Sequence, residues 1–184
     1  MMTSYLDYPF DNAKILRKHK SIKKQLLKTQ PLIVIKVAVL GGSTTSQLIS
    51  ILELFLLKNG FQPSFYESQY NKIYEDSVFE NLELKDFNPD IIYIHTTHYN
   101  ITEFPSYTAT ADQIDTLRLN ELQKFQNIWN GLQEYNCPII QNNFDYPMHR
   151  SLGNLDCYDI HGKTYFLSRL NLDFAAEAQK NAAL

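Results

Sequence analysis

Hydrophobic residues along the chain fall into short unbroken runs, separated by longer segments in which they recur every three or four positions. The run at 33–40 is rich in Val and Ile and ends at Gly41 and Gly42. Such runs are typical of central parallel strands that are covered on both faces. The two glycines permit a tight turn, and Thr44 or Thr45 can cap the helix that follows. We therefore expect a buried first strand, with a ligand site at its C-terminal end.

The same patterns predict the rest of the architecture. Further short runs indicate strands at 61–66, 91–95, 138–140 and 163–167. Segments with helical spacing indicate helices at 46–58, 76–84, 112–135 and 170–179. Strands that alternate with helices favour a parallel sheet joined by right-handed crossovers. We expect a three-layer α/β fold of the flavodoxin type, with strand order 2-1-3-4-5.

An amphipathic segment precedes this sheet. Asp11 can cap a helix over 12–28, in which Ile15, Ile22 and Leu26 share one face and lysines cover the rest. We interpret the lysines as a solvated face and not as a nucleic-acid patch, although an acidic carrier protein could use this basic surface.

Pro31 marks the boundary between two parts of the chain. We predict a helical arm at 1–30 and an α/β domain at 31–184.

Composition narrows the functional classes. A net charge of -3 and a pI near 5.9 give no general attraction to nucleic acid or anionic membranes. Cys137 and Cys157 lack metal-ligand spacing and are interpreted as reduced packing residues. We find no apolar run of transmembrane length and no signal peptide. We therefore expect a cytoplasmic protein.

The end of the first strand carries the main chemical candidate, Ser43. It can act as a nucleophile, which requires a base and oxyanion donors. Four histidines could supply the base, and side-chain or backbone amides could supply the donors: His95, His98, His149 and His161, with Asn100, Asn142 and the amides of Gly42 and Ser43. Alternatively, Ser43, Thr44 and Thr45 cap a helix and leave its first amides free for an anion.

The parallel topology should gather these candidates at one rim. Ser43, the loop from His95 to Asn100, and Asn142 with Asn143 all follow strands. We interpret His95 as a hydrogen-bonded core residue and His98 as a ligand contact. The His-x-x-His spacing has no acidic or cysteine cluster beside it, so we expect no metal. The chain has no dinucleotide or Walker motif, so we expect no cofactor.

The strand–Gly-Gly-Ser–helix pattern resembles the first block of SGNH/GDSL hydrolases, in which Gly-Asp-Ser carries the nucleophile. Gly42 stands at the Asp position and Ser43 at the serine position. Asn100 resembles the Asn of the family's Gly-x-Asn-Asp block. The Asp-x-x-His block has no clean counterpart, because Asp159-Ile-His161 is one residue short and the spacing from Asp145 to His149 is one too long.

A second resemblance covers nearly the whole chain. Five strings are similar to the N-terminal SGNH-like region of FkbH-like proteins, which belong to subfamily IIIC of the HAD superfamily: 35–45, 65–71, 89–96, 138–144 and 152–154. The resemblance implies a following HAD domain, and transfer of an acyl or glyceryl unit to an acyl carrier protein or a role in surface-polysaccharide biosynthesis. The HAD nucleophile motif Asp-x-Asp-x-Thr does not occur in these 184 residues.

Two hypotheses follow. In the first, the chain is a non-hydrolytic accessory module that binds a carrier protein, an acyl or small-molecule substrate, or its own HAD domain. In the second, it is an esterase or acyl hydrolase with Ser43 as nucleophile, His98 or His161 as base and Asn100 as oxyanion donor. Under either hypothesis, the residues that we expect to contact the ligand are Gly41, Gly42, Thr44, Thr45, His95, Asn142 and Asn143.

Overall fold

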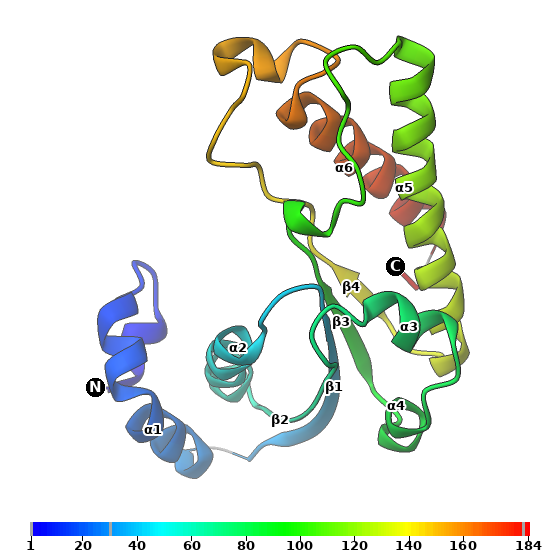
Figure 1. Cartoon of the computed structure of the whole chain (residues 1–184). Helices are drawn as coiled ribbons and strands as arrows, with labels where there is room; N and C mark the ends of the chain where they lie inside the picture. Colours follow the sequence, from blue (N-terminus) through cyan, green and yellow to red (C-terminus); the bar gives the residue numbers. More distant parts are fainter. Residues whose placement is uncertain (1, 30, 182) are drawn as a thin grey trace.

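Four parallel strands form the central sheet of the chain. In the computed structural model, which describes residues 2–29, 31–181 and 183–184, they lie in the order β2-β1-β3-β4. Their bounds are β1 Ile33–Gly41, β2 Phe61–Glu67, β3 Ile91–His95 and β4 Ile139–Gln141. This order confirms the predicted arrangement of the first four strands, with β1 and β3 side by side at the centre (Figure 1).

Helices lie on both sides of this sheet, as expected for a three-layer α/β fold. The α-helices are α1 Asn12–Thr29, α2 Ser46–Lys58, α3 Ile73–Val78, α4 Leu82–Phe87, α5 Ala111–Leu132 and α6 Lys163–Lys180. Short 3-10 helices are η1 Met2–Leu6, η2 His98–Asn100, η3 Gln133–Tyr135 and η4 Gly153–Cys157. Alternate side chains of each strand therefore face opposite layers of helices.

The larger core lies between the sheet, α5 and α6. Ala38 and Leu40 of β1 contribute to it together with Ile92 and Ile94 of β3. From α5 and α6 it receives a cluster of large side chains, namely Phe125, Ile128, Trp129, Leu132, Phe166, Leu167, Leu170 and Phe174. Burial of these side chains contributes about 1.5–3 kcal/mol each, so this core is the main support of the strands that carry the rim.

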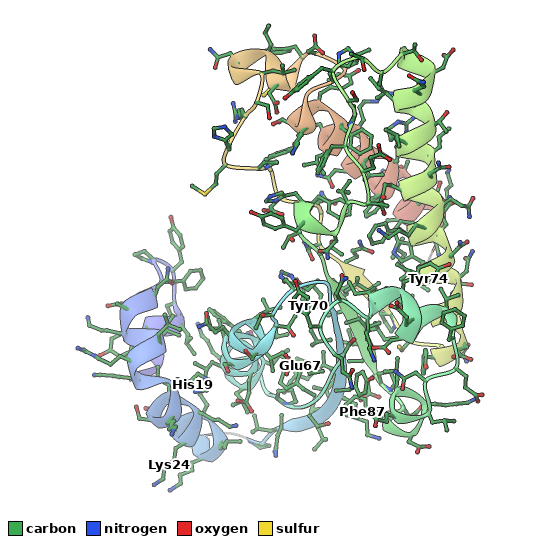
Figure 2. All side chains as sticks on the ribbon, viewed as in Figure 1. His19, Lys24, Glu67, Tyr70, Tyr74 and Phe87 are labelled. Atoms are coloured by element: carbon green, nitrogen blue, oxygen red, sulfur yellow. The ribbon has the colours of Figure 1, made fainter. Side chains whose placement is uncertain are left out.

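The smaller core joins the N-terminal arm to α2. Ile15, Ile22 and Leu26 of α1 are buried against Leu54 and Leu57 of α2, which confirms the predicted apolar face. The exposed lysines of α1 point away from this contact, as Figure 2 shows for Lys24. The arm therefore packs onto the α/β domain and covers the outer side of α2.

Polar contacts reinforce this packing. The Lys14 amide donates to Asp11 Oδ1 at 3.0 Å, so Asp11 caps α1 as predicted. His19 Nε2 lies 2.8 Å from the carbonyl oxygen of Ser50 on α2. His19 therefore lies on the side of α1 that faces α2 (Figure 2).

Two expected elements were wrong. The segment 163–167 is the first part of α6 and not a fifth strand, because Phe166, Leu167, Leu170 and Phe174 continue one buried stripe at helical spacing. The segment 76–84 contains the end of α3 and the start of α4. The sequence pattern missed that break.

Local hydrogen bonds explain both corrections. Asp156 Oδ2 accepts from the Thr164 amide at 2.8 Å, and this satisfies one of the free N–H groups at the start of α6. Asn81 Oδ1 accepts from the Leu84 amide at 3.0 Å, so Asn81 starts a new helix.

Candidate functional site

The turn after β1 is held by the neighbouring strands. The Gly42 amide donates to the His95 carbonyl at 2.9 Å, and the Asn71 amide donates to the Gly41 carbonyl at 3.2 Å. A Cβ on Gly42 would overlap the side-chain amide of Asn100, so this close approach requires glycine. The predicted meeting of the β1 turn with the loop after β3 is therefore present.

Asn100 connects that turn to η2. Its Nδ2 donates to the Gly42 carbonyl at 2.9 Å, and its Oδ1 accepts from the Thr97 amide at 2.8 Å. The Thr97 hydroxyl completes a capping box with this asparagine. The hydrolase hypothesis requires the Asn100 side-chain amide to donate to an oxyanion. In the structure this amide donates to the backbone carbonyl of Gly42 instead.

The start of α2 differs from the expected capped helix. Thr45 is buried at the N-cap position, but its hydroxyl donates to Glu67 Oε1 at 2.6 Å and makes no cap hydrogen bond. The prediction of a side-chain cap by Thr45 was wrong, because Thr45 has helical backbone angles (φ -105°, ψ -9°) and its hydroxyl is turned toward the Glu67 carboxylate of β2. Ser43 is half-buried and Thr44 is exposed beside this uncapped end.

His98 is oriented by a carboxylate from the next loop. Asp145 follows β4, and its Oδ2 lies 2.9 Å from His98 Nδ1, while its Oδ1 accepts from the His98 amide at 2.8 Å. Burial raises the pKa of Asp145, but the hydrogen bonds from His98 outweigh it and hold this pKa below its usual value. With Nδ1 on the carboxylate, Nε2 of a neutral ring is an acceptor, as a general base requires.

His95 and Asn142 stabilise the rim from below. The Tyr93 hydroxyl lies 3.3 Å from His95 Nδ1, and the Tyr93 side chain projects from the same face of β3. Asn142 Oδ1 accepts from the Thr96 amide at 2.9 Å, and its Nδ2 donates to the Thr96 carbonyl at 2.7 Å. This pair of hydrogen bonds links the chain segments immediately after β3 and β4.

Two other predicted residues lie outside the Ser43 turn. His161 Nδ1 contacts Asp159 Oδ1 at 2.7 Å, and its Nε2 contacts the Ala109 carbonyl at 3.0 Å. These acceptors raise the pKa of His161, because they favour the protonated ring. Its segment lies between η4 and α6, away from the β1–α2 turn in Figure 1. Asn143 lines a separate cavity beside β4.

A crevice of about 270 Å³ opens beside Asn100, between α3, η2 and α5. Its inner wall is apolar, from Ile73, Phe125 and Ile128. Its polar and aromatic lining residues are Asn71, Tyr74, Glu75, Tyr99, Asn100, Thr102 and Lys124. Of these, Asn100 was predicted from the sequence and the others were missed. Among the missed residues Asn71 gave a signal, since it ends the polar loop 68–71; in the structure it has a positive φ of 57°.

Lys124 joins this crevice to the loop above it. Its Nζ donates to the Asn100 carbonyl at 3.0 Å and to Thr102 Oγ1 at 3.1 Å, and it lies 3.2 Å from Glu121 Oε2. Glu121 is buried, and its other carboxylate oxygen accepts from the Thr102 amide at 2.8 Å. The wall of the crevice is therefore held in place by a paired charge network.

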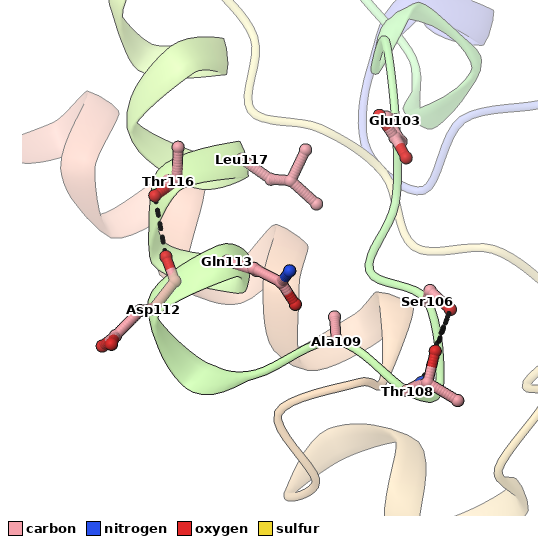
Figure 3. A pocket seen from close by; sticks show the side chains of 8 residues that line it. All are labelled: Glu103, Ser106, Thr108, Ala109, Asp112, Gln113, Thr116 and Leu117. Carbon is pink, nitrogen blue, oxygen red and sulfur yellow. Dashed lines mark hydrogen bonds between the residues drawn. The ribbon is translucent and has the colours of Figure 1, made fainter.

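A cavity of about 610 Å³ lies at the start of α5 and contains none of the predicted site residues (Figure 3). Hydroxyl, carboxyl and carboxamide groups line it, from Glu103, Ser106, Thr108, Asp112, Gln113 and Thr116. Several of these groups bond to one another, as Ser106 and Thr108 do at 3.2 Å. Across residues 2–29, 31–181 and 183–184, no cluster of three or more His, Cys, Asp and Glu side chains is arranged to hold a metal ion.

Comparisons with known proteins identify the fold. The sequence matches no protein-family model and no curated protein. Among solved structures, the chain is similar to the N-terminal part of the protein BF1531 from Bacteroides fragilis, described as containing a phosphatase domain complexed with Mg. The TM-score is 0.68 at 18% identity, over 90% of this chain and 43% of that one. The chain thus spans less than half the length of the structure that it resembles. Within its described residues, no helix has the length and apolarity needed to cross a membrane.

Proposed function

We propose that the chain is the SGNH-like N-terminal module of an FkbH-like protein of the HAD superfamily, and that it binds a substrate arm without cleaving it. The similarity to the N-terminal part of a protein with a phosphatase domain supports this placement. In the proposed protein, a HAD-type second domain performs phosphoryl, acyl or glyceryl transfer, or a step in surface-polysaccharide biosynthesis. The module itself requires no cofactor.

The observation that carries the binding role is the position of the Asn100 side chain. Its Nδ2 is hydrogen-bonded to the Gly42 carbonyl, and the Gly42 amide is hydrogen-bonded to His95. Both groups are donors that an oxyanion would need, and releasing them would cost about 1–3 kcal/mol each. With these donors already hydrogen-bonded, the rim is better suited to form a rigid wall against a bound ligand than to stabilise the oxyanion of an acyl-transfer reaction.

The crevice beside Asn100 suits the end of an extended acyl arm. Its apolar inner wall can cover a short acyl group, while Asn71 and Tyr74 offer polar contacts at its mouth. The pantetheine arm of an acyl carrier protein has this chemistry. The exposed Lys20, Lys24 and Lys28 of α1 offer a basic surface to an acidic carrier.

Titration with acetyl-pantetheine tests this proposal. We expect saturable shifts of the backbone NMR signals of Asn71 and Asn100, and a loss of affinity of about tenfold in Tyr74→Ala, which removes part of the wall. Tyr107→Ala is the matched control, because Tyr107 is exposed and does not line the crevice. Shifts that never saturate, or equal affinity in the two variants, would contradict binding at this crevice.

A second function, serine ester hydrolysis, is favoured by the His98–Asp145 pair. Its geometry resembles the base and orienting carboxylate of a catalytic triad, with Ser43 on the neighbouring turn. A fluorophosphonate probe separates the two functions. Labelling that disappears in Ser43→Ala, weakens in Asp145→Asn and persists in the exposed-serine control Ser106→Ala would establish the hydrolase. Absence of labelling together with absence of ester turnover would exclude it.

A further inference from the structure

The outer edge of β4 has unpaired backbone groups. The Pro138 carbonyl accepts from the Ile92 amide at 3.0 Å, so Pro138 and Ile140 direct their backbone groups toward β3. Successive residues of a strand point their backbone N–H and C=O groups toward opposite edges. The backbone groups of Ile139 and Gln141 therefore point away from β3, toward the outer edge of the sheet. Among the described residues, the Ile139 carbonyl and both backbone groups of Gln141 have no hydrogen-bond partner.

One backbone hydrogen bond to this edge is already present, from the turn that the Leu184 amide closes by donating to the Asn181 carbonyl at 3.1 Å. The Ile139 amide donates to the Ala183 carbonyl at 2.6 Å. In a parallel pair, an amide that bonds to one residue lies opposite the next residue, so a parallel strand that continues from this bond would place Leu184 opposite Ile139. Consistent with this, Leu184 is partly buried against the same core as Ile139.

A groove continues beyond this rung. A cavity of about 260 Å³ lies between β4 and α6, and all the residues that line it are uncharged: Trp129, Ile139, Ile140, Gln141, Asn143, Phe174, Ala175, Ala178 and Leu184. A second cavity, of about 280 Å³, shares Trp129 and Leu184 with it. The small side chains of Ala175 and Ala178 leave room beneath α6 for side chains from one more strand.

A buried donor in this groove is also unsatisfied. Gln141 Oε1 accepts from Trp129 Nε1 at 2.6 Å, but Gln141 Nε2 is buried and has no partner among the described residues. An unpaired buried donor is costly, and such groups normally have a partner in the protein or in ordered water. The Ile139 carbonyl and the backbone groups of Gln141 at this edge therefore have no partners among the described residues, and neither does the side-chain donor Gln141 Nε2.

We propose that the edge of β4 accepts a fifth, parallel strand, formed by the extended segment that connects this module to its second domain. This inference rests on the proposed two-domain protein. Such a segment would continue directly after Leu184, from the Ile139–Ala183 hydrogen bond. The first residue after Leu184 would donate its amide to the Ile139 carbonyl and accept from the Gln141 amide. The second residue would lie opposite Gln141, with its side chain toward the groove. A threonine there could accept a hydrogen bond from Gln141 Nε2, and the uncharged lining favours apolar neighbours.

A short tail added after Leu184 tests the proposal on the intact chain. The test tail is Val-Thr-Val-Thr-Val, and the control tail is Pro-Thr-Pro-Thr-Val, which lacks the N–H groups that would bond to Ile139 and Gln141. The measurement is amide hydrogen exchange at Gln141, with the Ile140 amide, which faces β3, as the internal reference. We expect exchange at Gln141 to slow about tenfold relative to Ile140 with the test tail only.

The other outcomes would overturn the proposal. Equal exchange with both tails would mean that no strand forms, or that the tail covers the groove without pairing. Protection of Gln141 in the untailed chain, together with a dimer in light scattering, would mean that a second copy occupies the edge. None of these results depends on the acyl-arm crevice, so failure here leaves the proposed binding function to its own test.

Discussion

The side-chain amide of Asn100 donates to the carbonyl oxygen of Gly42 at 2.9 Å, although 58 residues separate them. This bond joins the turn after the first strand to the helix after the third, and it closes the space in which a side chain on residue 42 would lie. The rim at the centre of the sheet is therefore a hydrogen-bonded unit.

Substitution of Gly42 should test this closure. Gly42→Ala places a methyl group against the carboxamide of Asn100, which is fixed by its own hydrogen bonds. We expect this substitution to lower the free energy of unfolding by about 1–3 kcal/mol. Urea denaturation measures the change. The double variant Gly42→Ala with Asn100→Gly should lose less than the sum of the single changes, because the clash is then removed. Strict additivity would show that the two residues do not compete for space.

Asn142 should matter more than its neighbour. Asn142→Ala removes both hydrogen bonds to Thr96 and leaves the Thr96 amide without its partner, so we expect a loss of about 1–3 kcal/mol. The matched control is Asn143→Ala, at an adjacent position of the same residue type. Thermal or urea unfolding of the two variants gives the comparison. Equal losses would argue against the Asn142–Thr96 bonds as the link between β3 and β4.

The arm should contribute to the stability of the whole chain. Ile22 is 0% exposed between α1 and α2, so Ile22→Ala should cost about 2–5 kcal/mol. Leu16 lies on the same helix but is 59% exposed, and Leu16→Ala should cost less than about 0.5 kcal/mol. A single unfolding transition that shifts only for Ile22→Ala is expected. If both variants unfold like the parent chain, the arm does not pack on α2 in solution.

His161 should titrate above the usual histidine range. The side chain of Asp159 and the carbonyl of Ala109 accept from its ring, and they raise its pKa above 6.5. The stabilisation that this proton provides is complete below the unfolded-state pKa and is lost as the pH rises through the folded-state pKa. Proton NMR of the ring should therefore give a pKa above 6.5, which falls in Asp159→Asn. An unchanged pKa in that variant would mean that the ion pair does not form.

The unfolding free energy provides a second readout of the same pair. As the pH rises from the unfolded-state pKa of His161 through its folded-state pKa, the parent chain should lose more stability than Asp159→Asn, since the parent gives up a more strongly bound proton. Parallel stability curves would contradict the predicted linkage.

The local sequence was sufficient to predict the elements in which all residues favour the same secondary structure. The Val- and Ile-rich run at 33–40, its two glycines and the helix at 46–58 have the predicted bounds to within one residue. Asp11 caps α1, and the apolar stripe of the arm is buried as expected. These features depend on backbone sterics and on side-chain periodicity, which act between near neighbours in the chain.

Other features were decided only when distant segments met. The short apolar run at 163–167 reads equally well as a strand or a helix, and the core beside α5 selected the helix. The hydroxyl of Thr45 donates to Glu67 of β2 and makes no cap hydrogen bond with α2. Local propensity carries no information about such partners.

The candidate site likewise has some features that the sequence predicted and others that only the tertiary structure revealed. Sequence placed Ser43, His98 and Asn100 after neighbouring strands, because parallel strands end on one edge of a sheet. It did not pair His98 with Asp145, which lies 47 residues away, nor reveal that Lys124 walls a crevice. Those relationships depend on how loops and helices lie in space, which only the packed tertiary structure determines.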